Sequence, residues 1–257
     1  MKKILAGFGI GLATLVLMGG AVYGAVYVST PESIRNPTFE HYHFRTQISV
    51  NGSPVNFTSE AFQSATPQAC SSVPPETPIH YHDGVDQLTH IHWNGITGGQ
   101  YLKYFGWNMI GGSDDSMGYV YSDGPLAMKQ LPIHGNSLPT VPEGSNYYVY
   151  AGDESSYEQK DWNNFISQNL EDFFGKQSKL KQNQETSFLE RLFFPSAYAH
   201  GGVDDGEHHN LDDAKLQEIN NLIGNVVIFV QPGEPSEAEI VEKFNNLVPL
   251  ENSICGG

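Results

Sequence analysis

The chain has 257 residues, of which 39% are apolar and 12% aromatic, so it can form a hydrophobic core of ordinary size. Its formal net charge of −16 argues against nucleic acid and anionic lipid surfaces as partners. The chain also lacks a P-loop, a dinucleotide-binding glycine fingerprint, a G-x-S-x-G turn and an HExxH motif, which excludes several common enzyme classes.

Residues 1–28 predict a membrane anchor. Lys2 and Lys3 precede an apolar run over residues 4–28, which as a helix rises ~1.5 Å per residue and reaches about 37 Å, enough to cross a bilayer. Lysines before the run favour an N-terminus inside the cell and residues 29–257 outside the cytoplasm. A cleaved signal peptide ending near Gly24 is the alternative, and it places the mature chain outside the cytoplasm too.

Residues 29–39 form a polar, proline-containing stalk, and residues 40–60 predict a β-hairpin. Its turn is Asn51-Gly52, the dipeptide preferred in type I′ turns. Pairing across this turn sets Phe44 opposite Ser59. One face of the hairpin is then apolar, and the other carries His41 and His43.

Residues 78–93 contain four of the ten histidines. They form two His-x-His pairs, His80/His82 and His90/His92, around the turn dipeptide Asp83-Gly84. Alternate residues of a strand share a face, so a hairpin that sets His80 opposite His90 or His92 brings all four imidazoles together. A shift of one residue would separate the pairs. The other face would be apolar, with Ile79, Tyr81, Ile91 and Trp93.

The paired histidines predict a metal site. Opposed Cβ atoms in a hairpin lie only ~4.5–5.5 Å apart, so His80, His82, His90 and His92 can converge on one divalent ion. Imidazole donors without sulfur favour Zn or Cu. His41 and His43 join the site if the polar face of the first hairpin turns toward it.

Two other functions remain open at this point. Buried histidines also serve as hydrogen-bonding residues, and the domain would then be a metal-free surface scaffold or a protein-interaction module with an unidentified partner. Three histidines and a water are also the ligand set of zinc hydrases and hydrolases. The sequence indicates neither a substrate nor a catalytic residue, so an enzyme is the less favoured class.

The chain beyond the second hairpin alternates between helix and strand signals. A short helix follows at residues 97–106, with Thr97 as N-cap and Gly106 just past its end. Strands are predicted at residues 117–121 and 146–151, with His134 in the loop between them. Residues 155–224 predict a helical insertion, with helices at 157–174, 187–194 and 211–223. A strand at 225–231 and a helix opened by the capping box Ser236-x-x-Glu239 complete the chain.

Two further features concern metal and redox chemistry. Within the insertion, an acidic and histidine-rich tract predicts weak, accessory metal binding, with a flexible loop as the alternative. The tract comprises His200, Asp204, Asp205, His208 and His209. Cys70 and Cys255 are the two cysteines, and an oxidising compartment favours a disulfide between them over two free thiols.

These elements predict an α+β fold with an antiparallel or mixed sheet, β-hairpins and a packed helix, an arrangement that loosely resembles a β-grasp. The histidine-rich domain spans residues 40–154. The helical insertion at residues 155–224 interrupts it, and residues 225–257 complete it.

Several of these motifs also occur together in a group of membrane-anchored prokaryotic proteins of uncharacterised activity, which the chain resembles. They are His41/His43, Asn51-Gly52, Cys70, residues 78–83, His90/His92, Gly106-Trp107 and residues 148–154. The resemblance implies a location outside the cytoplasm and the extent of the domain, and it implies no reaction.

Overall fold

The structure, a computed structural model, describes residues 39–63, 78–81, 84–107, 119–122, 128–131, 137–177 and 213–250, together with 14, 17–21 and 24. The strands are β1 (Phe39–Val50), β2 (Ser53–Pro54), β3 (Ile79–His80), β4 (Leu88–Trp93), β5 (Tyr119–Ser122), β6 (Met128–Leu131), β7 (Asn146–Gly152), β8 (Tyr157–Lys160) and β9 (Leu222–Gln231). The helices are α3 (Gly98–Tyr104), α4 (Trp162–Ser167), α5 (Leu170–Phe174), α8 (Asp213–Ile219) and α9 (Glu237–Asn245).

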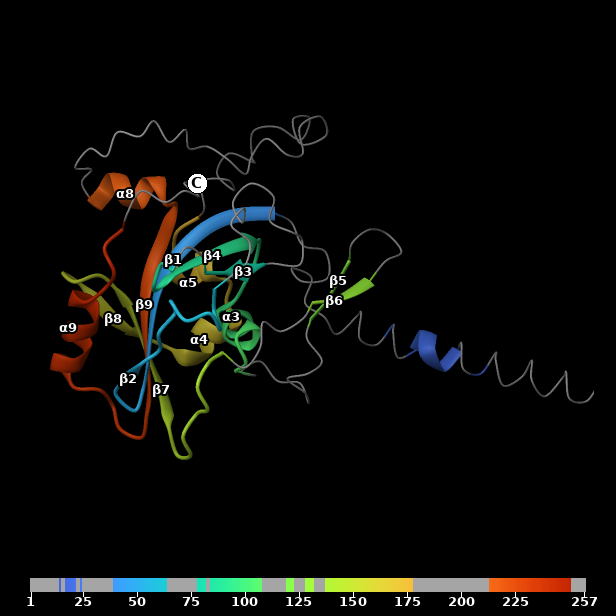
Figure 1. Ribbon diagram of the computed structural model, residues 1–257, viewed down its shortest axis with the longest axis horizontal. Coiled ribbons are helices and arrows are strands. Elements are labelled where there is room, and N and C mark those ends of the chain that lie inside the picture. The colour runs from blue at the N-terminus through green and yellow to red at the C-terminus, as the bar shows by residue number, and fades with distance from the viewer. Residues whose placement is uncertain are drawn as a thin grey trace, which may run out of the picture.

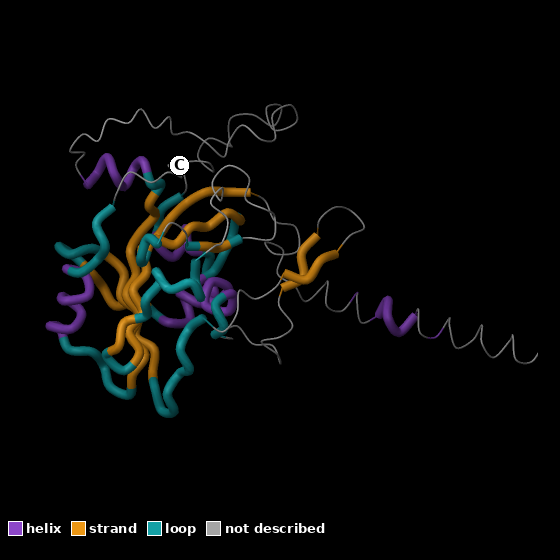
Figure 2. The backbone as a smooth tube through the Cα atoms, viewed as in Figure 1, coloured by secondary structure: helices purple, strands orange, loops and turns teal. Residues whose placement is uncertain are grey.

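A seven-stranded sheet organises the fold, in the order β3-β4-β1-β9-β7-β8, with β2 paired to β1 (Figures 1 and 2). The pair β5-β6 forms a separate two-stranded sheet. Strand β1 pairs antiparallel with β4 and parallel with β9, which makes the sheet mixed. The predicted α+β class is therefore confirmed.

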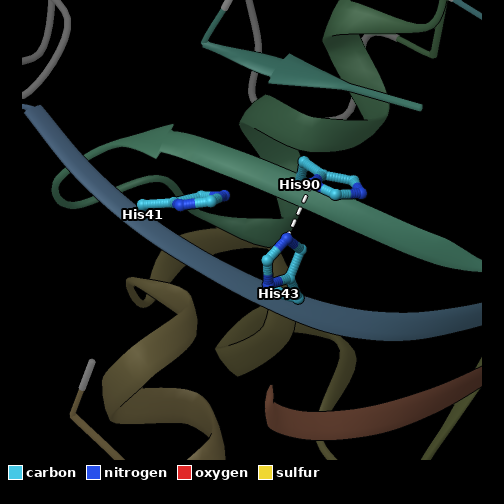
Figure 3. Close-up of side chains that lie close together, drawn as sticks. All are labelled: His41, His43 and His90. Carbon is cyan, nitrogen blue, oxygen red and sulfur yellow. Dashed lines mark hydrogen bonds between the residues drawn. The ribbon is translucent and has the colours of Figure 1, made fainter. Parts of the chain in front are cut away.

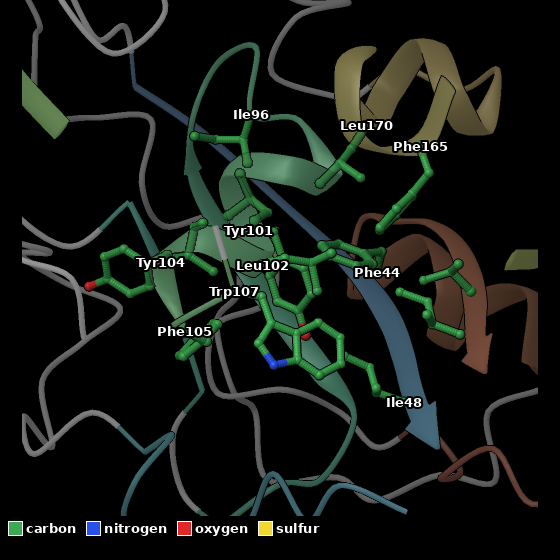
Figure 4. Close-up of a cluster of buried hydrophobic side chains, with 14 of the residues drawn as sticks. Phe44, Ile48, Ile96, Tyr101, Leu102, Tyr104, Phe105, Trp107, Phe165 and Leu170 are labelled. Atoms are coloured by element: carbon green, nitrogen blue, oxygen red, sulfur yellow. The ribbon is translucent and has the colours of Figure 1, made fainter. Parts of the chain in front are cut away.

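Both sheet faces are covered. Helices α3, α4 and α5 pack on one face over a large aromatic core that includes Phe44, Tyr101, Phe105 and Phe165 (Figure 4). Helix α9 packs on the other face, where a smaller cluster consists of Tyr150, Val227, Phe229, Ile240 and Phe244. Strand β9 lies between the two layers, and this explains its long run of buried residues.

The first hairpin turn is confirmed, but its second strand is shorter than predicted. Asn51 and Gly52 have φ of 48° and 80°, the two positive values of a type I′ turn. Strand β2 ends at Pro54, so the predicted pairing of Phe44 with Ser59 is wrong. The side chain of Asn56 accepts from Thr58 N and turns the chain away, and Thr89 of β4 takes the place opposite Phe44.

The register predicted for the histidine hairpin is confirmed. His80 lies opposite His90, and Ile79 lies opposite Ile91. The predicted apolar face, with Ile79, Tyr81, Ile91 and Trp93, belongs to the core. His82 and Asp83 lie outside the described residues.

Three helix ends follow the predictions closely. Thr97 caps α3 and forms a capping box with Gln100, and Gly106, one residue past the C-cap, has φ of 107°. Ser236 and Glu239 form the capping box of α9. A capping box depends on four consecutive residues, so these helix starts could be predicted without knowing the rest of the fold.

The segment 155–224 departs from the predicted helical insertion in two places. Residues 157–160 are strand β8, which forms a hairpin with β7, and the helix predicted over 157–174 is two short helices. Asp161 caps α4 and Asn169 caps α5, and each cap starts a new helix axis. The last predicted helix ends early because Asn221 has φ of 45°, and β9 begins at Leu222.

Several predicted features lie outside the described residues. They are the helix at 187–194, the tract from His200 to His209 with Asp204, Asp205 and His208, the cysteines Cys70 and Cys255, and His134. Most of residues 1–38 also lies outside them. Within the part of the chain that the structure describes, no helix is long and apolar enough to cross a membrane.

Candidate metal site

Five histidines lie buried together on one face of the sheet. His41 and His43 come from β1, His80 from β3, and His90 and His92 from β4. Their exposed fractions run from 0% to 6%. The polar face of β1 does turn toward the second hairpin, because His43 lies directly opposite His90 in the β1-β4 pair. His43, His90 and His80 thus form a row across three adjacent strands.

A β-bulge sets the position of His41. The pairs Phe39↔Trp93 and Tyr42↔Ile91 enclose two residues of β1, Glu40 and His41, but only His92 on β4. Such an insertion bends the strand and re-aims the side chains beside it. The His41 ring lies on the His92 ring with the centroids 4.9 Å apart and an interplanar angle of 13°.

The five imidazoles form a closed ring of contacts. Successive centroids are separated by 4.8 Å (His41–His43), 4.1 Å (His43–His90), 5.0 Å (His90–His80), 4.7 Å (His80–His92) and 4.9 Å (His92–His41). His43 meets both of its neighbours edge-on, at 64° and 87°. The other three contacts are stacked, with angles of 9° to 19°.

The distances between ring nitrogens decide which imidazoles can share an ion. The His41 and His90 rings are stacked, with centroids 6.2 Å apart and an interplanar angle of 24°, and His43 lies edge-on to both. Because an imidazole lone pair lies in the ring plane, His41 or His90 would turn on binding a shared ion. His41, His43 and His90 place one ligand atom each within 4.8 Å of one another (Figure 3). Among the described residues this is the one such group of three histidine, cysteine or acidic side chains.

The converging set overlaps only in part with the four predicted ligands. His90 belongs to it, and His41 and His43, whose participation depended on the first hairpin, are its other members. His80 stacks on His90, and His92 stacks on His41. His80 and His92 are therefore neighbours of the converging set and not members of it.

Hydrogen bonds fix the state of His43. Its Nδ1–H donates to the backbone carbonyl of Asn220, since a carbonyl oxygen only accepts. In the neutral ring, Nε2 is then an acceptor, and it lies 2.6 Å from His90 Nδ1. One proton is shared between these two nitrogens. A tetrahedral ion with bonds of ~2.0–2.1 Å separates its ligand nitrogens by about 3.3 Å, so an ion would replace this proton and part the two rings by about 0.7 Å.

The donor set is nitrogen-only, and the phenol of Tyr42, between two of the ligands in the sequence, does not join it. Burial, followed by the charges of Glu40 and Glu171, raises the pKa of Tyr42 well above its ordinary value. Tyr42 therefore stays a neutral phenol, and its side chain belongs to the core on the opposite face of the sheet. Neutral imidazoles suit Zn(II) and Cu(II) better than Ca(II) or Mg(II), which take oxygen ligands.

Sequence reasoning missed Asn220 and Asn221, which contact two of the three histidines. Asn220 supplies the carbonyl for His43, and Asn221 Nδ2 donates to the carbonyl of His41 over 2.5 Å. The sequence signal for these two residues is an Asn-Asn pair between a helical pattern and a buried strand. Asparagine tolerates the left-handed backbone conformation that ends helices, so the pair indicates a helix end next to the strand.

No protein-family model, curated protein or solved structure matches this chain. The case for a function therefore comes from the geometry of the histidines.

Proposed function

We propose that this chain is a metal-binding protein that holds one divalent ion, Zn(II) or Cu(II), between His41, His43 and His90. The observation that carries the proposal is the close approach of three buried imidazoles, each with one ligand atom within 4.8 Å of the other two. His43 also donates its second ring N–H to a backbone carbonyl, the outer contact that metal-ligating histidines usually make.

Burial of the site favours a structural ion over a catalytic one. Three protein ligands leave a position for water, as in zinc hydrases. The three side chains are only 5%, 0% and 1% exposed, however, and a substrate would need to reach them. A tightly enclosed ion that joins β1 to β4 would instead stabilise the sheet.

We further propose that the domain works outside the cytoplasm and is held to the membrane by residues 4–28. Lys2 and Lys3 before an apolar run support this orientation. In that setting Cys70 and Cys255 would form a disulfide, and the tract from His200 to His209 would be an accessory metal-binding segment. The net charge of −16 would raise the local concentration of cations.

The test is metal analysis of the full chain, purified in detergent without a polyhistidine tag or chelator. We expect about one equivalent of zinc or copper. His43→Gln and His90→Gln should remove it, because each deletes a converging ligand. His134→Gln is the matched control, since it deletes one imidazole outside the three His-x-His pairs and should retain the metal.

Two results would count against the proposal. A metal-free wild-type protein whose unfolding is unchanged by added zinc would leave the scaffold as the function. Metal lost with His80→Gln but kept with His43→Gln would show that the sequence-predicted set, and not the converging one, binds the ion.

A further inference from the structure

A sharp corner in the chain lies next to the histidines, where α8 ends and β9 begins. Asn220 N donates to Leu216 O over 3.0 Å, and Asn221 N donates to Glu218 O over 3.1 Å. Asn221 then takes φ of 45°, which stops the helix. Both asparagines are buried, at 0% and 6% exposed.

Three contacts join this corner to β1. The carbonyl of Asn220 accepts from His43 Nδ1, the side chain of Asn221 donates to His41 O, and His43 N donates to Asn221 O over 3.2 Å. A register shift in β9 brings the corner here, because His43 pairs with Leu222 while Phe44 pairs with Gly224. The extra residue, Ile223, is a bulge beside the site.

We infer that the Asn220–Asn221 corner is the positioning element of the histidine site, which sets the tautomer of His43 and holds the backbone of His41. The inference rests on the proposed function and deepens it by naming the residues that prepare the ligands. With the proton held on Nδ1, the lone pair of neutral His43 lies on Nε2, the atom that faces His90. The ligand is thus oriented before an ion arrives.

The backbone of Asn221 controls this orientation. The direction of the Asn220 carbonyl depends on the peptide plane between residues 220 and 221, and therefore on φ of Asn221. Glycine and asparagine adopt positive φ readily, whereas a β-branched residue does so only under strain. Substitution of Asn221 by valine should rotate the carbonyl away from His43, and substitution by glycine should not.

The experiment compares Asn221→Val with Asn221→Gly in the full chain. Both variants lack the amide that holds His41, and they differ in their tolerance of positive φ. Asn51→Val is the matched control, because Asn51 has φ of 48° in an exposed turn remote in sequence from the corner. The tautomer of His43 is measured in the metal-free protein by imidazole ¹⁵N NMR above about pH 8, where the ring is neutral. Zinc affinity is measured by competition with a chromophoric chelator.

We expect wild-type His43 to carry its proton on Nδ1. Asn221→Val should mix the two tautomers and weaken zinc binding by ~10–100-fold, the range for lost outer contacts of metal ligands. Asn221→Gly should keep the tautomer and lose less affinity, and Asn51→Val should change neither. If Asn221→Val does not fold, Asn221→Ala takes its place against Asn221→Gly.

Two outcomes would overturn the inference. One is a wild-type His43 protonated on Nε2, and the other is an Asn221→Val variant with the wild-type tautomer and affinity. A wild-type protein that binds no zinc while His43 still carries Nδ1–H would instead defeat the proposed function, so the two failures are distinguishable.

Discussion

Gly224 lies in the bulged part of β9, and alanine at this position should destabilise the fold. A Cβ atom there would lie 2.2 Å from Cδ1 of Phe174 and 2.7 Å from two other ring atoms. Normal carbon contacts are ~3.5–4.0 Å, so the ring must retreat by about 1.3–1.8 Å. The Phe44 ring, with its centroid 5.9 Å away, and the Phe173 ring, 5.0 Å away, restrict that movement.

Two opposing effects determine the size of the change. Overpacking a core typically costs ~1–3 kcal/mol, whereas replacing glycine by alanine stabilises by ~0.4–1 kcal/mol through the unfolded state. Subtracting the second range from the first gives an expected net loss in the free energy of unfolding of about 0–2.6 kcal/mol, centred near ~1.3 kcal/mol. With a urea m-value of ~2 kcal/mol per M, the central value lowers the midpoint by roughly 0.65 M, and the upper limit lowers it by about 1.3 M.

Urea unfolding followed by tryptophan fluorescence measures this change. Gly233→Ala is the control, because a Cβ there meets nothing within 4 Å, and its midpoint should stay near that of the wild type. In a Phe174→Leu background, the cost of Gly224→Ala should shrink, since the smaller side chain relieves the clash. A Gly224→Ala variant as stable as the wild type would refute the packing argument.

Two more predictions concern a carboxylate and a helix cap. Burial raises the pKa of Asp86, so its ionised form opposes folding above the folded-state pKa, and this cost disappears as the pH falls below the unfolded value of ~3.9. Asp86→Asn keeps an oxygen acceptor for Phe57 N and should equal or exceed the wild type in stability at pH 7. This advantage should vanish by about pH 3–4 in urea titrations. An advantage that grows on acidification would contradict the prediction. Thr97→Ala removes the N-cap of α3 and should lower the free energy of unfolding by ~0.5–2 kcal/mol in the same assay. Thr140→Ala, at an exposed position, is the control and should lower it by less than about 0.5 kcal/mol. Equal losses in the two variants would mean that the cap contributes nothing to stability.

The sequence alone determined the local features of this protein. The positive φ values at Asn51-Gly52, the capping boxes at Thr97 and Ser236, and the placement of the histidine pairs on one face all depend on a few neighbouring residues. Side chains alternate along a strand whatever its partners are, so the spacing of His90 and His92 was enough to put both on one face. His80 joins them through the register of the β3-β4 pair, in which it lies opposite His90.

Only the tertiary structure decided which histidines converge. His43 lies opposite His90 because β1 pairs with β4, and the carbonyl of Asn220 reaches His43 because β9 pairs in parallel with β1 from far along the chain. Turn dipeptides select hairpin partners, but no local pattern selects partners far apart in the sequence, because that choice depends on the apolar surface buried by the whole sheet. The bulges at Glu40–His41 and at Ile223 are further features of the site that strand alternation does not predict.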